Sequence, residues 1–160
     1  MSFDVFVQAF RNGDATPADA DAVRQILTQY VTETDSAGFA RLSTADGGAD
    51  LYGYDELGSG FMANHVSGSD AWEVLVRAAV AGGLVIIPVG CPVGITDRSS
   101  FEHLPDGLRA GEVSIVSSGT QLIDLIEGRL WACPVCFEPV LSGRPYENWP
   151  PADLTTLSVP

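Results

Sequence analysis

Two cysteines near the carboxyl end form the most specific short motif of the chain, Cys133-Pro134-Val135-Cys136. Two thiolates at this spacing can bind one zinc ion as half of a tetrahedral site. Completing the site needs two more ligands, for which only Cys91, His103 and His65 are available, and the spacing from Cys91 or His103 matches no zinc finger or ribbon. The spacing also suits a redox dithiol, but the motif follows the last predicted helix instead of starting one, so activation by a helix dipole is not expected. We therefore expect no cofactor, and keep a zinc- or thiol-dependent protein as an alternative.

A second group of residues offers acid–base chemistry. His65, Asp97 and His103 can act as proton donors or acceptors, and Ser99 or Ser100 as a nucleophile. None of them lies in a hydrolase, zinc-protease or phosphate-loop motif. A small enzyme of unknown reaction therefore stays a further alternative, and we favour a protein without catalytic residues.

Carboxylates alternate with tyrosines in one acidic segment. Tyrosine supplies rigid aromatic contact area, and neighbouring carboxylates attract a basic protein surface. The simpler alternative is a solvated hairpin whose tyrosines pack locally. We take as candidate partner-binding residues Asp46, Asp50, Tyr52, Tyr54, Asp55 and Glu56.

The charge of the chain narrows the class of partner. Among 160 residues, 21 are acidic and 8 are basic, which gives a formal net charge of -13. Nucleic acid and anionic lipid would be repelled before contact, whereas a basic protein or a cationic ligand would be attracted. An acidic surface that only maintains solubility is the simpler reading of the same numbers.

The stretch from Ser69 to Val89 is the predicted centre of the fold. Its first part has apolar residues at helical spacing, and Asp70 with Glu73 has the pattern of an N-terminal cap. After Gly82-Gly83, the run from Leu84 to Ile87 has no polar alternation. We expect this run to form a central strand that is covered on both faces.

The remaining elements follow from periodicity and turn residues. Alternation predicts a first strand over 3–10, and an apolar stripe predicts a helix over 17–32 with Thr16 as its cap. Turn chemistry at Asp46-Gly47-Gly48 predicts a hairpin. Later elements are a strand over 58–66, a short helix over 98–104, a strand over 113–116 and a helix between Ser118 and Gly128.

This order predicts an α+β fold: a mostly antiparallel sheet with two main helices on one face and a third helix near the C-terminus. We expect one domain over 1–128. Residues 129–160 carry six of the ten prolines and two of the three tryptophans. They are expected to form an extended tail docked on the domain.

A membrane location is not expected. Residues 78–95 carry no charge, but four glycines and two prolines interrupt them, which favours a buried helix, turn and strand. The start of the chain lacks the pattern of a secretory signal, so we expect a cytoplasmic protein.

Three segments, MSFDVFVQAFRNGD, GGADLYGYD and IIPVGCP, together resemble a group of small acidic bacterial proteins. Small acidic α+β proteins of this kind are often immunity proteins, which block the active site of a toxin. The resemblance is compatible with a non-catalytic binding protein that neutralises or regulates a protein partner, and the acidic, tyrosine-bearing segment would supply the binding surface. The resemblance supplies no catalytic residues.

Overall fold

The computed structural model describes residues 4–132, 136–137 and 139–141. The elements of the first half are β1 (Val5–Gln8), β2 (Phe10–Arg11), β3 (Asp14–Ala15), α1 (Ala20–Leu27), β4 (Val31–Thr34), β5 (Phe39–Ser43), β6 (Gly48–Tyr52), β7 (Gly60–Ser67) and α2 (Ser69–Gly82). Those of the second half are β8 (Val85–Pro88), β9 (Val93–Ile95), the 3-10 helix η1 (Arg98–His103), α3 (Asp106–Arg109), β10 (Val113–Ile115), α4 (Gly119–Ile126), β11 (Leu130–Ala132) and β12 (Pro139–Leu141).

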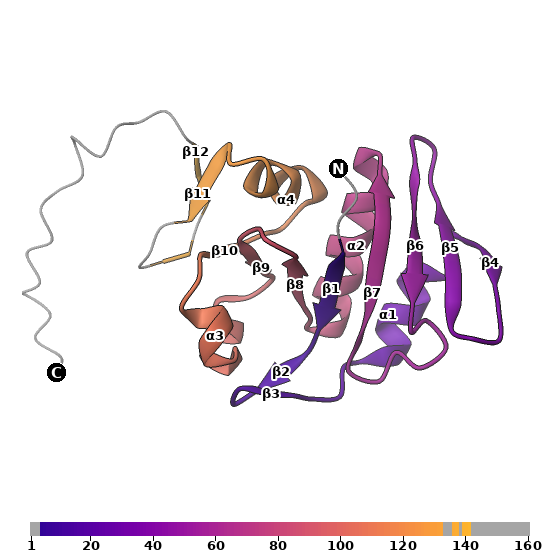
Figure 1. Ribbon diagram of the computed structural model, residues 1–160, viewed down its shortest axis with the longest axis horizontal. Helices are drawn as coiled ribbons and strands as arrows, with labels where there is room; N and C mark the ends of the chain where they lie inside the picture. Colours follow the sequence, from indigo (N-terminus) through magenta and orange to yellow (C-terminus); the bar gives the residue numbers. More distant parts are fainter. Residues whose placement is uncertain (1–3, 133–135, 138, 142–160) are drawn as a thin grey trace, which may run out of the picture.

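Eight strands form one sheet in the order β10-β9-β8-β1-β7-β6-β5-β4 (Figure 1). Every neighbouring pair is antiparallel except β9 and β10, which run parallel. The hairpin predicted around Asp46-Gly47-Gly48 is present as β5 and β6. The predicted α+β class with a mostly antiparallel sheet is confirmed.

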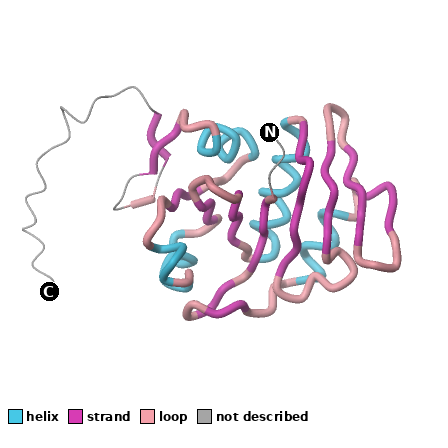
Figure 2. The backbone as a smooth tube through the Cα atoms, in the orientation of Figure 1, coloured by secondary structure: helices cyan, strands magenta, loops and turns pink. Residues whose placement is uncertain are grey.

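One face of the sheet carries the main core. Helices α1 and α2 lie behind the strands in Figure 2, α4 lies above β8–β10 in that view, and contacts place α2 between the other two helices. Alternation along β1 turns Val5 and Val7 toward these helices, where Leu27 and Leu75 are also fully buried. The two main helices therefore share one face, as predicted.

A second core lies on the opposite face at the β8–β10 end of the sheet. There η1 and α3 cover the strands, and Leu104 packs with Val85, Val93 and Ile95. Strand β8 therefore has protein on both faces, which explains why its sequence lacks polar alternation. Over β5, β6, β7 and β1 the same face bears no helix from the described ranges; we name this region the open sheet face.

The predicted cap of α2 by Asp70 and Glu73 is wrong. Gly68 is the N-cap residue, with φ of 80°, and the cap hydrogen bonds come from a distant carboxylate. Asp46 accepts from the backbone nitrogens of Ser69 at 2.6 Å and Asp70 at 3.2 Å. Glu73 instead accepts from the backbone nitrogen of Gly119 at 2.6 Å, which joins the start of α4 to α2.

The first helix is shorter than predicted. Helix α1 covers Ala20–Leu27, and the side chain of Asp19, rather than Thr16, accepts from the nitrogen of Ala22 at 3.0 Å. The chain turns after Leu27, and Val31 joins edge strand β4 opposite Leu42. Pairing at the sheet edge outweighs the helical periodicity of this segment.

Part of the predicted tail forms ordered structure. Strands β11 and β12 pair as a hairpin, and the nitrogen of Ile115 donates to the carbonyl of Phe137 at 2.7 Å. The ring of Phe137 stacks on Phe101 of η1, with centroids 4.3 Å apart. Residues 142–160 lie outside the described residues.

The uncharged stretch at 78–95 contains the end of α2, all of β8 and β9, and the turns between them. Within the described part of the chain, no helix has both the length and the apolar character needed to cross a bilayer.

Candidate functional site

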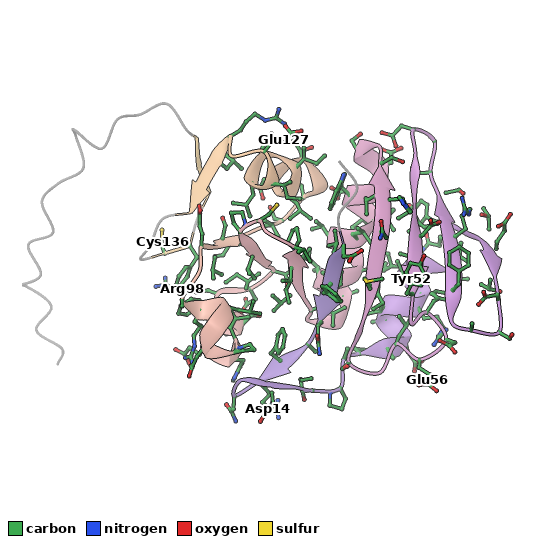
Figure 3. All side chains as sticks on the ribbon, in the orientation of Figure 1. Asp14, Tyr52, Glu56, Arg98, Glu127 and Cys136 are labelled. Atoms are coloured by element: carbon green, nitrogen blue, oxygen red, sulfur yellow. The ribbon has the colours of Figure 1, made fainter. Side chains whose placement is uncertain are left out.

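Two of the predicted partner-binding residues, Asp50 and Tyr52, lie together on the open sheet face. Both belong to β6, where Ala49 and Leu51 are buried in the main core. Since successive side chains of a strand alternate, Asp50 and Tyr52 project from the opposite face. Tyr52 is 42% exposed (Figure 3).

A row of apolar side chains crosses the open sheet face at right angles to the strands. Cross-strand register places Tyr52 beside Phe39 and Met62, and Phe6 beside Met62 and Ile87. Phe6 is 40% exposed, and the rings of Phe39 and Tyr52 meet edge to face at 5.7 Å. We name as the apolar row, in spatial order, Phe39, Tyr52, Met62, Phe6 and Ile87; the last of these, on β8, ends the row where it packs against the second core.

A polar row lies beside the apolar row, two residues along each strand. Register places Arg41 opposite both Glu33 and Asp50, and Asp50 opposite Asn64. The side-chain amide of Asn64 donates to Asp4 at 2.6 Å, which extends the row to the start of β1. The polar row therefore consists of Glu33, Arg41, Asp50, Asn64 and Asp4.

Asp50 is the most strongly paired carboxylate of the polar row. Its two oxygens lie 3.1 Å from the guanidinium of Arg41 and 3.0 Å from Nδ1 of His65. His65 occupies a left-handed conformation, with φ of 51°, where the β6–β7 register shifts by a bulge. Bulges redirect side chains, and this one places the His65 ring against Asp50.

Asp46, in contrast, lies at the N-terminus of α2. Besides the two backbone nitrogens, the hydroxyls of Ser69 and Thr44 donate to it at 2.8 and 3.2 Å. The hydroxyl of Ser69 is the main cause that lowers the pKa of the Asp46 carboxyl below its usual value. Asp46 thus stabilises a helix terminus.

Tyr54, Asp55 and Glu56 follow β6 in a loop beside α1. The hydroxyl of Tyr54 is 2.9 Å from that of Thr28, and the guanidinium of Arg24 lies 5.4 Å from the Tyr54 ring centroid. Arg24 also donates to the carbonyls of Tyr54 and Asp55, both at 3.2 Å. The loop is therefore fastened to α1, with Glu56 exposed at the lower edge of the molecule in Figure 3. The six predicted residues consequently fall in three places.

The described residues do not bring a zinc site together. Cys133 lies outside them, and Cys91 and Cys136 are half-buried free thiols. Within the described ranges, no group of three or more histidine, cysteine or acidic side chains could hold a metal. Burial raises the pKa of the Cys91 thiol, which lowers its thiolate population at neutral pH.

The candidate acid–base residues are also apart. His65 lies near Asp50, beyond the start of β1, whereas Nδ1 of His103 is 3.5 Å from the backbone nitrogen of Asn12, beyond its end. Asp97 caps η1 by accepting from the nitrogen and hydroxyl of Ser99, and that hydroxyl lowers the pKa of its carboxyl. Two surface hollows, of about 410 and 180 Å³, include neither histidine in their lining.

Sequence reasoning missed most of the apolar row. Its one usable signal is an apolar side chain on the otherwise polar face of an alternating strand. In β1, Phe6 lies on the same face as Asp4 and Gln8, while Val5 and Val7 form the core face. Which of these side chains become neighbours depends on strand register, which the alternation does not specify.

No family model matches the chain, and the searches found no similar curated protein and no similar solved structure. The resemblance to small acidic bacterial proteins of the immunity kind therefore stays a prediction.

Proposed function

We propose that this protein is a non-catalytic binding protein that neutralises or regulates a basic protein partner, in the manner of an immunity protein, and that it binds through the open sheet face. The observation that carries the proposal is the exposure of Phe6 and Tyr52 within a continuous apolar row. A large exposed aromatic pair on an ordered sheet is typical of an interaction surface.

The polar row supports a basic partner. Glu33, Asp50 and Asp4 contribute three carboxylates to it, against one guanidinium from Arg41. The net charge of -13 adds a long-range field of the same sign, which accelerates encounter with a cationic surface.

We place this function in the cytoplasm. Cys91 and Cys136 carry free thiols, which are usual in a reducing compartment. The partner would then be a cytoplasmic protein or a toxin that reaches the cytoplasm.

Site-specific photocross-linking in the source cell tests the proposal. A benzophenone side chain is introduced at Tyr52 and, in a matched control, at Val80, which is 56% exposed on α2. We expect one discrete protein adduct from position 52 and none from position 80. The adduct, identified by mass spectrometry, is expected to be a basic protein whose association rate falls as salt rises from 50 to 300 mM.

Equal labelling from both positions, or no protein adduct from position 52, would count against the open sheet face. Turnover of a metabolite by the purified chain would count against a non-catalytic role.

A further inference from the structure

The two rows determine how a partner element can lie on the open sheet face. A helix aligned with the strands needs apolar side chains at successive same-face positions of one strand. Here those positions change from apolar to polar or glycine: Met62 is followed by Asn64 in β7 and preceded by Gly60, and Phe6 lies between Asp4 and Gln8. Continuous apolar contact is available only across the strands.

We infer that the occupant of the open sheet face is a basic amphipathic helix of the partner protein, lying across β5, β6, β7 and β1 along the apolar row, with one end next to Ile87 of β8. This inference rests on the proposed function and adds the class of element that binds.

Spacing favours a helix over an extended segment. Five side chains on neighbouring strands span about 19 Å, since strands lie about 4.8 Å apart. Helix positions i, i+4, i+7, i+11 and i+14 span about 21 Å at 1.5 Å per residue. Five same-face residues of an extended strand span about 27 Å. Their spacing is longer than the distance between strands, so they would no longer lie opposite the side chains of the row after two or three contacts.

Charge specifies the side of the helix. With its apolar stripe on the row, one flank of the helix faces the polar row, where the carboxylates of Asp50 and Asp4 lie beside one guanidinium, that of Arg41. On the other side of the apolar row the neighbouring positions are Gly60 and the uncharged Gln8. Arginine or lysine is therefore expected on the flank that faces the two carboxylates.

A second copy of the chain fits this face less well. Each copy carries a net charge of -13, which opposes association. The apolar row offers contact area on the order of a few hundred Å², against the roughly 800 Å² per partner of a standard stable interface. A single docked helix matches the smaller area.

Selection from a random peptide library tests the inference. Phage-displayed 18-residue peptides are selected on the full chain in the presence of excess soluble Phe6→Ser/Tyr52→Ser variant, which removes peptides that bind elsewhere. We expect enriched peptides to carry apolar residues at i, i+4, i+7 and i+11 with arginine or lysine on one flank. Synthetic copies should become helical on binding, as measured by circular dichroism.

Affinity measurements on matched variants complete the test. We expect Tyr52→Arg, at an exposed position that tolerates a polar side chain, to weaken the selected peptide at least tenfold. Val80→Ser, which removes an even more exposed apolar side chain on α2, should leave affinity unchanged. Circular dichroism of each variant establishes that it is folded. If the Phe6→Ser/Tyr52→Ser variant does not fold, the folded Tyr52→Arg variant replaces it as the competitor in the selection.

Three results would overturn the inference: peptides with period-two alternation, an absence of enriched peptides, or dimerisation of the chain that Tyr52→Arg abolishes. Failure of the proposed function is distinguishable, because it is the absence of a cellular adduct from position 52 whatever the peptides do. A cellular adduct together with period-two peptides would retain the function and reject the helix.

Discussion

At the scale of single residues, acidic side chains hold the fold together across long sequence separations. Asp46 caps a helix that begins 23 residues later, and Glu73 holds the start of a helix 46 residues later. Hydrogen bonds from backbone nitrogens to ionised carboxylates are stronger than neutral ones and satisfy the free donors of a helix terminus. Acidic composition here therefore contributes to structure as well as to surface charge.

Asp46→Ala should lower the thermal stability of the protein at pH 7, and Asp46→Asn should lower it less, because asparagine keeps one acceptor oxygen. Since the folded-state pKa of Asp46 is lowered, its contribution is fully present above the unfolded-state pKa of about 3.9 and is lost as pH falls through the folded-state value. The difference in Tm between wild type and Asp46→Ala should thus shrink below pH 4. Calorimetry from pH 7 to pH 2.5 measures it, with the exposed Asp14→Ala as control. A difference that stayed constant with pH would argue against the cap.

Gly119→Ala should destabilise the protein strongly. A Cβ atom there would lie 2.3 Å from the backbone nitrogen of Glu73, so α4 would have to move away from α2. Overpacking of this kind costs about 1–3 kcal/mol of unfolding free energy. Gly107→Ala is the matched control, because nothing lies within 4 Å of a Cβ at that position. Urea unfolding measures both; equal effects would show that the α2–α4 contact is not close.

At the scale of elements, α2 is the centre of the main core. It contacts α1 on one side and α4 on the other, and its buried side chains lie against the sheet. The exposed Val80 shows that the helix keeps one face outside this packing.

Leu75→Ala should reduce the unfolding free energy by about 2–5 kcal/mol, because the side chain is fully buried and its removal leaves a cavity. Val80→Ala on the exposed face should change it by less than about 0.5 kcal/mol. Denaturant titrations measure the change in unfolding free energy for each substitution. Similar changes for both would contradict the placement of Leu75 in the core and Val80 on the exposed face.

The sheet shows how an edge is protected and a face is left free. Edge strand β4 is short and contains a bulge between Val31 and Glu33, both of which discourage pairing with another strand. The apolar row, in contrast, occupies the middle of the open sheet face. This contrast favours association through the sheet face over addition of a strand to β4.

At the scale of the whole molecule, the net negative charge opposes self-association and attracts cationic partners. With 21 acidic and 8 basic residues, repulsion between molecules is strong at pH 7. The apolar row can then stay exposed without self-association, because the surrounding negative charge opposes contact between two copies of the chain.

Solubility should therefore depend steeply on pH. As the carboxylates are protonated, the net charge falls toward zero near the isoelectric point of about 4.2, and the apolar row is no longer protected. Light scattering from pH 7 to pH 4 should rise most close to that value. Tyr52→Ser should reduce the rise in scattering, whereas Val80→Ser should not. An equal reduction by both substitutions would show that the apolar row does not cause the aggregation.

The amino-acid sequence alone determined the α+β class and the order of the main helices and strands, although it missed β4, β9 and the β11–β12 hairpin. Helical and alternating periodicities report which faces are buried, and the uninterrupted run from Leu84 to Ile87 correctly indicated a strand covered on both sides. It also identified Asp50 and Tyr52 as surface candidates. These properties are local, because each depends on a few consecutive side chains.

Only the tertiary structure decided which side chains meet. Asp46 became a helix cap, Tyr54 was fastened to α1, and Tyr52 joined Phe6 and Met62 in one row. Such contacts depend on strand order and register between segments far apart in the chain, where a shift of one residue would turn every side chain to the other face. Local periodicity carries no information about that register, so the apolar row emerges only when five strands are assembled.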